Sequence, residues 1–141
     1  MKKASLALLF LALLVVGLQG KASANPIIQA HLTGANEVNG GDPDGSGDAT
    51  ISLSPGGSEL CFNIVVTGLA ATTGAHIHRG VAGVNGPIVV ALTAPVNGSS
   101  TGCVPVDSKL LKEIQQHPDQ FYVNVHTTEY PGGAIRGQLS K

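Results

Sequence analysis

Two histidines separated by a single residue, His76 and His78, are the residues of this sequence best placed to do chemistry. In an extended strand, residues two apart project from the same face, so both imidazoles point the same way at a separation of about 6–7 Å. Ile77, between them, then points to the core. Two imidazoles on one stiff strand make half of a metal site, and the pattern predicts that a third ligand comes from another strand.

The third ligand is expected from the segment 121–127, which contains His126. Its apolar residues alternate toward the core, which leaves Tyr122, Asn124 and His126 on the opposite face. Three imidazoles with no thiolate or carboxylate suit copper or zinc, and the affinity order favours copper. Metal bonds near 2 Å would bring the ring nitrogens within about 4 Å of one another. His31 is a further candidate, as a fourth ligand.

The alternative interpretation of these histidines is structural, with each ring hydrogen-bonded to the backbone of a loop. His117, at the end of an expected helix, is expected to face solvent. Arg136 is expected to form a salt bridge on a strand surface, or else to lie near the histidines and attract anions.

An acidic, glycine-rich segment at residues 42–48 resembles the start of a calcium-binding loop, because oxygen-bearing side chains recur at alternate positions. The twelfth position of that loop is Leu53, where a calcium loop has Glu. Its proline and glycines make a hairpin connection the simpler interpretation, so calcium is not expected. Motifs of serine hydrolases, phosphate-binding loops, cysteine-rich zinc sites and paired catalytic carboxylates are absent from the sequence.

The first 24 residues have the three parts of a secretory signal peptide: a lysine pair, an apolar run and the small residues Ala-Ser-Ala. The apolar run, at about 15 residues, is shorter than the roughly 20 that a membrane span needs. We therefore expect cleavage after Ala24 and a mature chain, residues 25–141, without a membrane span. Such a protein is periplasmic or secreted.

Export changes the interpretation of the two cysteines, Cys61 and Cys103. In an oxidising compartment they most simply pair with each other. The bond would close a loop of about 43 residues, for which chain entropy predicts about 4 kcal/mol of stabilisation. A catalytic thiol is the alternative, but Cys61 lies within an apolar strand that has no nearby histidine.

Composition narrows the classes of protein further. The chain has 141 residues, of which 12% are charged, with a formal net charge of −1 at pH 7. That length fits one domain, and an apolar chain of low net charge folds rather than staying disordered. Eight Lys and Arg residues in total do not make the basic stripe of a nucleic-acid binder.

Short segments with period-2 alternation, separated by Gly- and Pro-rich turns, predict seven or eight strands. The expected strands are 27–33, 48–54, 59–67, 75–79, 87–92, 102–106, 121–127 and 134–139. One helix is expected at 107–116, because Asp107 is a good N-cap and the residue before Pro118 leaves the helical region. This pattern predicts an all-β fold: an antiparallel β-sandwich or flattened barrel with one short crossover helix.

Two blocks of the sequence resemble the CHRD domain, a module first named from chordin and also found in exported bacterial proteins. They are GAHIHRGVAGVNGPIVVAL at 74–92 and FYVNVHTTEYPGGAIRGQL at 121–139, and LTGANEV at 32–38 and ELCFNIVVTGL at 59–69 agree as well. The family usually has a proline pair after the NEV, where this chain has Asn-Gly-Gly, a departure confined to a loop. The resemblance implies a single CHRD-type domain over residues 25–141.

The His-x-His strand and the later Val-His also look like the copper side of copper–zinc superoxide dismutase, a Greek-key antiparallel sandwich. That likeness would assign His76, His78 and His126 as copper ligands. It fails at the bridging histidine and the zinc loop, because no histidine lies between Arg79 and Gly102. Dismutase chemistry, and enzymatic activity in general, is therefore not expected.

These patterns predict a non-enzymatic copper-binding protein that sequesters copper or transfers it to a copper-handling partner. The alternative is a metal-free interaction module that binds protein or glycan through loops at one end of the sandwich. Nothing in the sequence indicates an oligomeric state.

Overall fold

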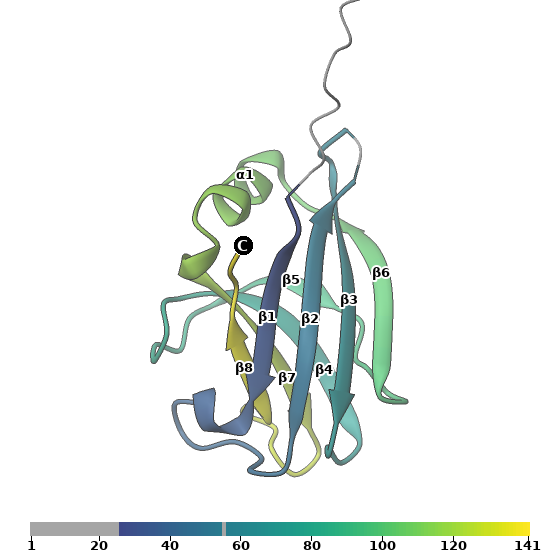
Figure 1. Cartoon of the computed structure of the whole chain (residues 1–141), viewed down its shortest axis with the longest axis vertical. Coiled ribbons are helices and arrows are strands. Elements are labelled where there is room, and N and C mark those ends of the chain that lie inside the picture. Colours follow the sequence, from purple (N-terminus) through teal and green to yellow (C-terminus); the bar gives the residue numbers. More distant parts are fainter. Residues whose placement is uncertain (1–25, 55) are drawn as a thin grey trace, which may run out of the picture.

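The computed structural model describes residues 26–54 and 56–141. The expected signal peptide, residues 1–24, lies outside the described part. The described chain forms eight strands, one α-helix and two short 3-10 helices (Figure 1). The strands are β1 (Ile28–Thr33), β2 (Ser46–Leu53), β3 (Glu59–Thr67), β4 (Thr72–Arg79), β5 (Ile88–Leu92), β6 (Ser99–Pro105), β7 (Phe121–Thr127) and β8 (Ile135–Gln138). The helices are α1 (Ser108–Gln116), η1 (Gly34–Asn36) and η2 (Pro118–Gln120).

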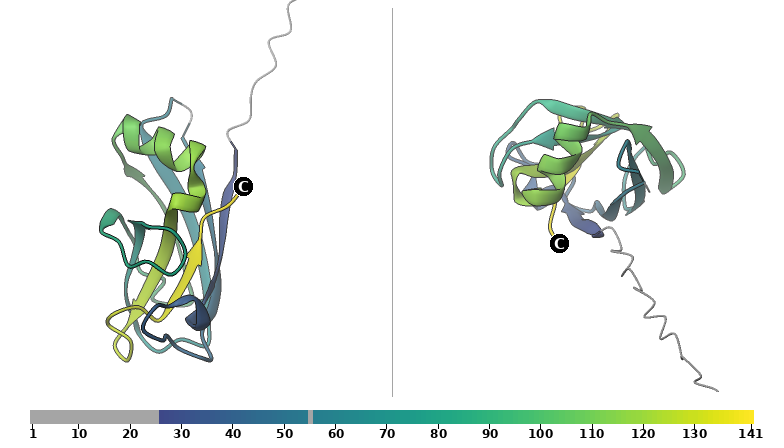
Figure 2. Two further views of the ribbon diagram at one scale, coloured as in Figure 1. Left: turned by 90° about the vertical axis from the view of Figure 1, so that its left-hand side faces the viewer. Right: turned by 90° about the horizontal axis from the view of Figure 1, so that it is seen from above.

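The eight strands belong to one hydrogen-bonded sheet with the order β5-β4-β7-β8-β1-β2-β3-β6. All neighbouring pairs are antiparallel. The sheet curls until it is nearly closed, so β4, β5 and β7 lie behind β1, β2 and β3 (Figures 1 and 2). The predicted all-β antiparallel fold with a single α-helix is confirmed, and its two facing layers are halves of one continuous sheet.

The core lies between these two halves, and the alternating pattern of the strands fills it. In β3, Leu60, Phe62, Ile64 and Val66 are buried, while the intervening residues are more exposed. Burial of a large apolar side chain contributes about 1.5–3 kcal/mol relative to exposure. The prediction of which face of β3 points inward is therefore confirmed.

Helix α1 connects the edge strand β6 to β7 in the other half of the sheet and lies at one end of the molecule (Figure 1). The Asp107 side chain accepts hydrogen bonds from the backbone N–H groups of Lys109 and Leu110, as expected of an N-cap. Leu111 and Ile114 are buried against the core. The helix ends at Gln116, and its C-cap His117 is exposed and precedes the proline.

Cys61 and Cys103 form a disulfide between directly opposed residues of β3 and β6, which confirms the predicted pairing. Strand β6 begins at Ser99 rather than near Gly102, where it was expected. Ser99, Ser100 and Thr101 have the composition of a turn, but they complete the ladder opposite β3. Pairing with a long neighbouring strand outweighs local preference here, and the turn is confined to residues 96–98, where Gly98 has φ of 85°.

Candidate metal centre

The three histidines predicted to form a metal site lie together on the outer face of the β4–β7 pair. In the register of this pair, His76 is opposite Asn124, His78 is opposite Tyr122, and His126 is opposite Gly74. The ring centroid of His76 is 5.7 Å from that of His78 and 5.0 Å from that of His126. The pairing of two segments far apart in sequence therefore brings all three imidazoles to one place.

One nitrogen from each ring lies within 4.8 Å of the other two. Two metal–nitrogen bonds near 2 Å hold their nitrogens no more than about 4 Å apart, so the observed span is too wide for a bound ion. Ion binding would therefore draw the rings inward by somewhat under 1 Å, a movement within the reach of small side-chain rotations. Within residues 26–54 and 56–141 this is the only group of three or more His, Cys, Asp or Glu side chains with such spacing.

The hydrogen-bonding pattern of the rings leaves one nitrogen of each free for a ligand. His78 Nδ1 lies 2.9 Å from the carbonyl oxygen of Gly86, and His126 Nδ1 lies 3.0 Å from that of Pro131. A carbonyl oxygen only accepts, so both Nδ1 atoms carry the proton and each Nε2 keeps its lone pair. Among the described residues, the buried atoms without a hydrogen-bond partner include His76 Nδ1, His78 Nε2 and His126 Nε2.

This pattern bears on the alternative, purely structural interpretation of the histidines. Bonds from His78 and His126 to loop carbonyls do exist, as that interpretation expects. They use only one nitrogen of each ring, and a buried polar atom without a partner is costly. Metal-binding histidines commonly donate their other N–H to a carbonyl, which fixes the tautomer and the ring orientation. Hydrogen bonds to loops therefore account for only one nitrogen each of His78 and His126. The remaining nitrogens fit a metal ion.

The electrostatic surroundings of His76 and His78 favour the neutral form of these two rings. Burial lowers the pKa of His76 below its usual range, and the neighbouring charges of His126 and His78 lower it further. Burial also lowers the pKa of His78; the hydrogen bond to Gly86 opposes this shift, while His126 and Arg136 add to it. Neutral imidazoles are the form that coordinates a metal ion.

Arg136 differs from its expected surface role. Only 2% of the residue is exposed, and its guanidinium donates to the carbonyl oxygens of Val81 and Val84 and to Oδ1 of Asn85. Its Cζ atom lies 3.4 Å from the centroid of the Tyr122 ring. The expected strand-surface salt bridge is therefore wrong, because the 81–85 loop folds over β8 and covers the arginine.

The outer face of β7 is buried as well as its inner face, which the alternating pattern did not predict. Tyr122 is 2% exposed and Asn124 is 3% exposed. The Asn124 side-chain Nδ2 donates to Glu37 Oε1. Burial raises the pKa of Glu37, and the charge of Arg136 and the bond from Asn124 oppose that shift.

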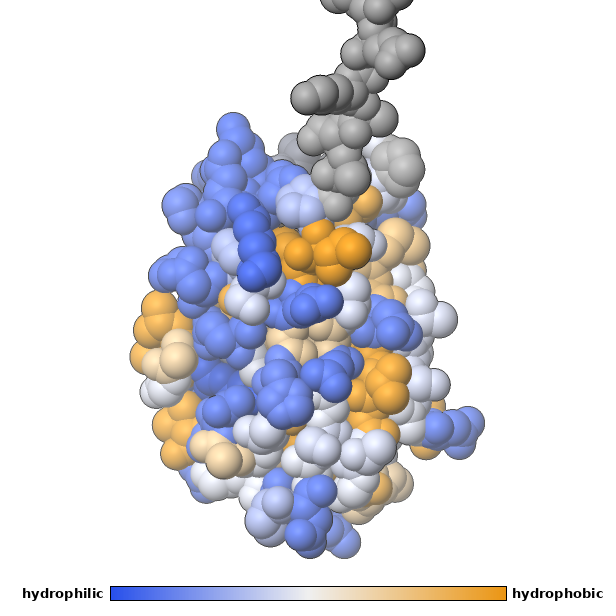
Figure 3. Space-filling view, in the orientation of Figure 1, coloured by the Kyte–Doolittle hydropathy of each residue, from blue (hydrophilic) through white to orange (hydrophobic). Residues whose placement is uncertain are grey.

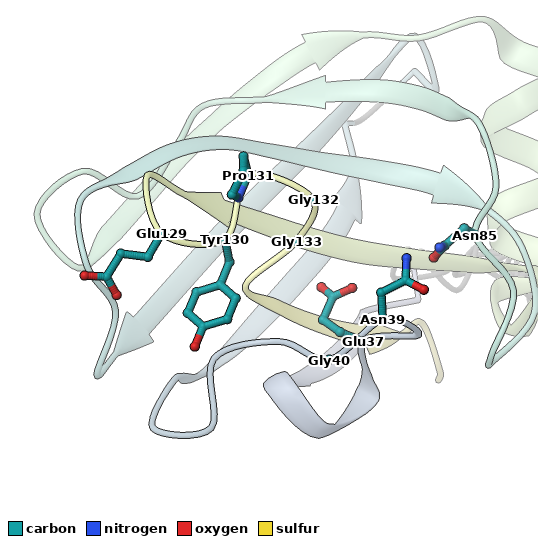
Figure 4. Close-up of a pocket in the computed structure, with 9 residues that line it drawn as sticks. All are labelled: Glu37, Asn39, Gly40, Asn85, Glu129, Tyr130, Pro131, Gly132 and Gly133. Atoms are coloured by element: carbon teal, nitrogen blue, oxygen red, sulfur yellow. The ribbon is translucent and has the colours of Figure 1, made fainter.

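Glu37 also lines a cavity, together with Asn39, Glu129 and the turn at residues 131–133 (Figure 4). Its carboxyl group points toward this turn. Gly133 in the turn has φ of 139°, and an added Cβ would lie 2.6 Å from Glu37 Oε1. The turn that supplies the Pro131 carbonyl to His126 therefore requires glycine on both conformational and steric grounds.

The structure does not bring His31 into the cluster. His31 is an exposed residue of β1, and its Nδ1 lies 2.9 Å from Oδ1 of Asp48 on the neighbouring strand β2. Strands β7 and β8 separate β1 from β4, so the histidine is on another part of the sheet.

In the 42–48 segment, Asp42 is buried and its Oδ1 accepts from the backbone N–H of Asp44, as in a turn.

Comparison with known families identifies the domain. A family model described as CHRD domain matches residues 28–139. The match includes every strand of the sheet and all three clustered histidines. No curated protein and no solved structure matches the chain. Among the described residues, no helix is both long and apolar enough to cross a membrane.

Proposed function

The chain belongs to the CHRD domain family, and from this premise we propose that it is an exported, non-enzymatic protein that binds copper. The ligands are His76, His78 and His126. The role is sequestration of copper, or its transfer to a copper-handling partner. The disulfide between Cys61 and Cys103 fits a protein of an oxidising compartment outside the cytoplasm.

One observation carries this proposal: three imidazoles converge from two adjacent strands, and each has a buried ring nitrogen without a hydrogen-bond partner in the described structure. The choice of copper rests on the donor set. Imidazole suits copper, zinc, iron and nickel, and divalent copper has the highest affinity in this series. The cluster contains only histidines, without the thiolates that mark a closed structural zinc site.

A titration of the mature protein, residues 25–141, with Cu(I) and Cu(II) tests the proposal. We expect one equivalent of each ion to bind to the wild type, and the His76→Ala/His78→Ala variant to lose this binding. The loss should exceed the about 10–100-fold that removal of an outer-shell partner costs, because two direct ligands are gone.

The matched control is the His31→Ala/His117→Ala variant, which removes the same number of histidines from exposed positions outside the cluster. It should bind copper as the wild type does. Equal binding by both double variants would show that copper binds elsewhere, and would refute the site. Superoxide turnover by the copper-loaded wild type would refute the non-enzymatic role.

A metal-free interaction module is the second candidate. Exposed valines on the β4–β5 loop and after η1 favour it, because such side chains are available to a protein partner. Val81, Val84 and Val38 are 42%, 48% and 44% exposed, respectively. Figure 3 shows apolar patches among hydrophilic residues on one face of the molecule. If the wild type binds neither copper ion, this candidate becomes the better explanation of the domain.

A further inference from the structure

Asn124 lies among the three histidines on the outer face of the β4–β7 pair, although no sequence pattern marked it as a site residue. It projects from the outer face of β7 between Tyr122 and His126, and its partner in the β4–β7 register is His76. His78 is opposite the preceding outward residue of β7, and His126 is the following one. Asn124 therefore occupies the middle row of the cluster, beside the point on which the three rings converge.

The orientation of the Asn124 amide follows from its single side-chain hydrogen bond. Nδ2 donates to Glu37 Oε1, which lies on the side of Gly133 and β8. Oδ1 is the other branch of the planar amide, and the residue paired with Asn124 on β4 is His76. The residue is 3% exposed, and within the part of the chain that the structure describes its Oδ1 has no hydrogen-bond partner.

This oxygen is an acceptor that requires a donor. Buried polar atoms are nearly always paired with protein or with ordered water. The three nearby ring nitrogens cannot supply a proton if they hold a metal ion, since two have their proton on the far nitrogen. A water molecule on the ion would be such a donor, and a buried water commonly makes about three hydrogen bonds.

We propose that Asn124 Oδ1 accepts a hydrogen bond from a water molecule that fills a fourth position on the bound copper ion. The inference rests on the proposed function and deepens it. Three imidazoles leave the coordination of Cu(II) incomplete, because Cu(II) prefers a tetragonal set of nitrogen and oxygen ligands. Cu(I), which is softer, has less need of the water. Asn124 therefore supports binding of Cu(II) in particular, with Glu37 as the residue that holds its amide in place.

Substitution Asn124→Leu tests this role, because leucine has nearly the same shape and no acceptor. Cu(II) affinity is expected to fall about 10-fold or more, the effect typical of a lost outer-shell partner, with Cu(I) affinity nearly unchanged. The matched control is Thr72→Val, which removes another buried oxygen that lacks a partner in the described structure. Thr72→Val should leave both copper affinities unchanged.

Pulsed electron paramagnetic resonance of the Cu(II)-loaded wild type provides a second measurement that does not depend on the variant folding. We expect strongly coupled protons on the ion that disappear in deuterium oxide. If wild-type Cu(II) shows no strongly coupled exchangeable protons, or if Asn124→Leu weakens binding of both ions equally, the inference is wrong while the three-histidine site stands. If the wild type binds no copper through its histidines, the proposed function and this inference both fail.

Discussion

The imidazole of His78 stacks on the ring of Tyr122, with the ring planes 8° apart and the centroids 4.8 Å apart. The Arg136 guanidinium also lies over the Tyr122 ring. The two groups come from strands on opposite sides of β7, His78 from β4 and Arg136 from β8. The backbone N–H of Gly86 donates to the Tyr122 hydroxyl, and the Gly86 carbonyl accepts from His78. Ring stacking and loop contacts thus position the same histidine of the candidate site.

Loss of the Arg136 side chain is expected to loosen this arrangement. Arg136→Met leaves the Val81 and Val84 carbonyls without their donor, and should lower the free energy of unfolding by about 2–4 kcal/mol. Arg136→Lys should restore little, since an ammonium lacks the planar fork that reaches several acceptors. Urea denaturation measures the stability, and amide hydrogen exchange of residues 81–86 measures the loop. Unchanged exchange in Arg136→Met would contradict the anchoring role.

Acid is expected to destabilise the metal-free protein through His76 and His78. Their pKa values are lowered from 6.5 in the folded state, so below that pH the unfolded chain binds protons that the native state does not. Stability is therefore greatest above pH 6.5 and is lost as the pH falls through that value to the lowered pKa values. Urea denaturation at a series of pH values measures the slope.

The control for this pH dependence is the His76→Gln/His78→Gln variant, which should have a flatter curve between neutral and mildly acid pH. The raised pKa of Glu37 acts in the opposite sense, because the native state holds its proton more tightly than the unfolded chain does. Glu37 is present in both proteins, so the difference between their curves isolates the histidines. Identical slopes would contradict the assignment of this pH dependence to His76 and His78.

Removal of the disulfide is expected to lower stability without affecting the metal site. The Cys61→Ala/Cys103→Ala variant loses a cross-link between residues 42 apart in sequence, for which chain entropy predicts about 4 kcal/mol. Strands β3 and β6 lie at the other end of the sheet order from β4. Chemical denaturation should show the full loss, while copper titration at a permissive temperature should match the wild type. A large change in copper affinity would contradict the expectation that the disulfide does not affect the histidine cluster.

The turn at residues 131–133 offers a matched pair of glycine substitutions. Gly133→Ala should cost about 1–3 kcal/mol, because φ of 139° is strained for alanine and the new methyl group would collide with Glu37. It should also weaken copper binding, since the same turn holds His126 through Pro131. Gly132→Ala places its methyl group in open space and should change stability by less than about 0.5 kcal/mol. Equal effects of the two substitutions would contradict this account.

Local sequence patterns were sufficient to locate the strands and the helix approximately and to put His76 and His78 on one face of a strand. Alternation placed Leu60, Phe62 and Ile64 on the inner face of β3, as the structure shows. Asp107 and Pro118 marked the limits of the helix through hydrogen bonding and sterics within a few residues. The His-x-His spacing predicted a shared face for the same reason, because a strand repeats every two residues.

Only the tertiary structure decided what covers each face and which strands become neighbours. Period-2 alternation distinguishes two faces, but it does not show that the 81–85 loop would bury Arg136, or that Glu37 would meet Asn124 across the sheet. Strand order likewise placed His126 beside His76 and left His31 elsewhere. These relationships depend on contacts between residues distant in sequence. Periodicity, capping and turn preferences act within a few residues and carry no information about them.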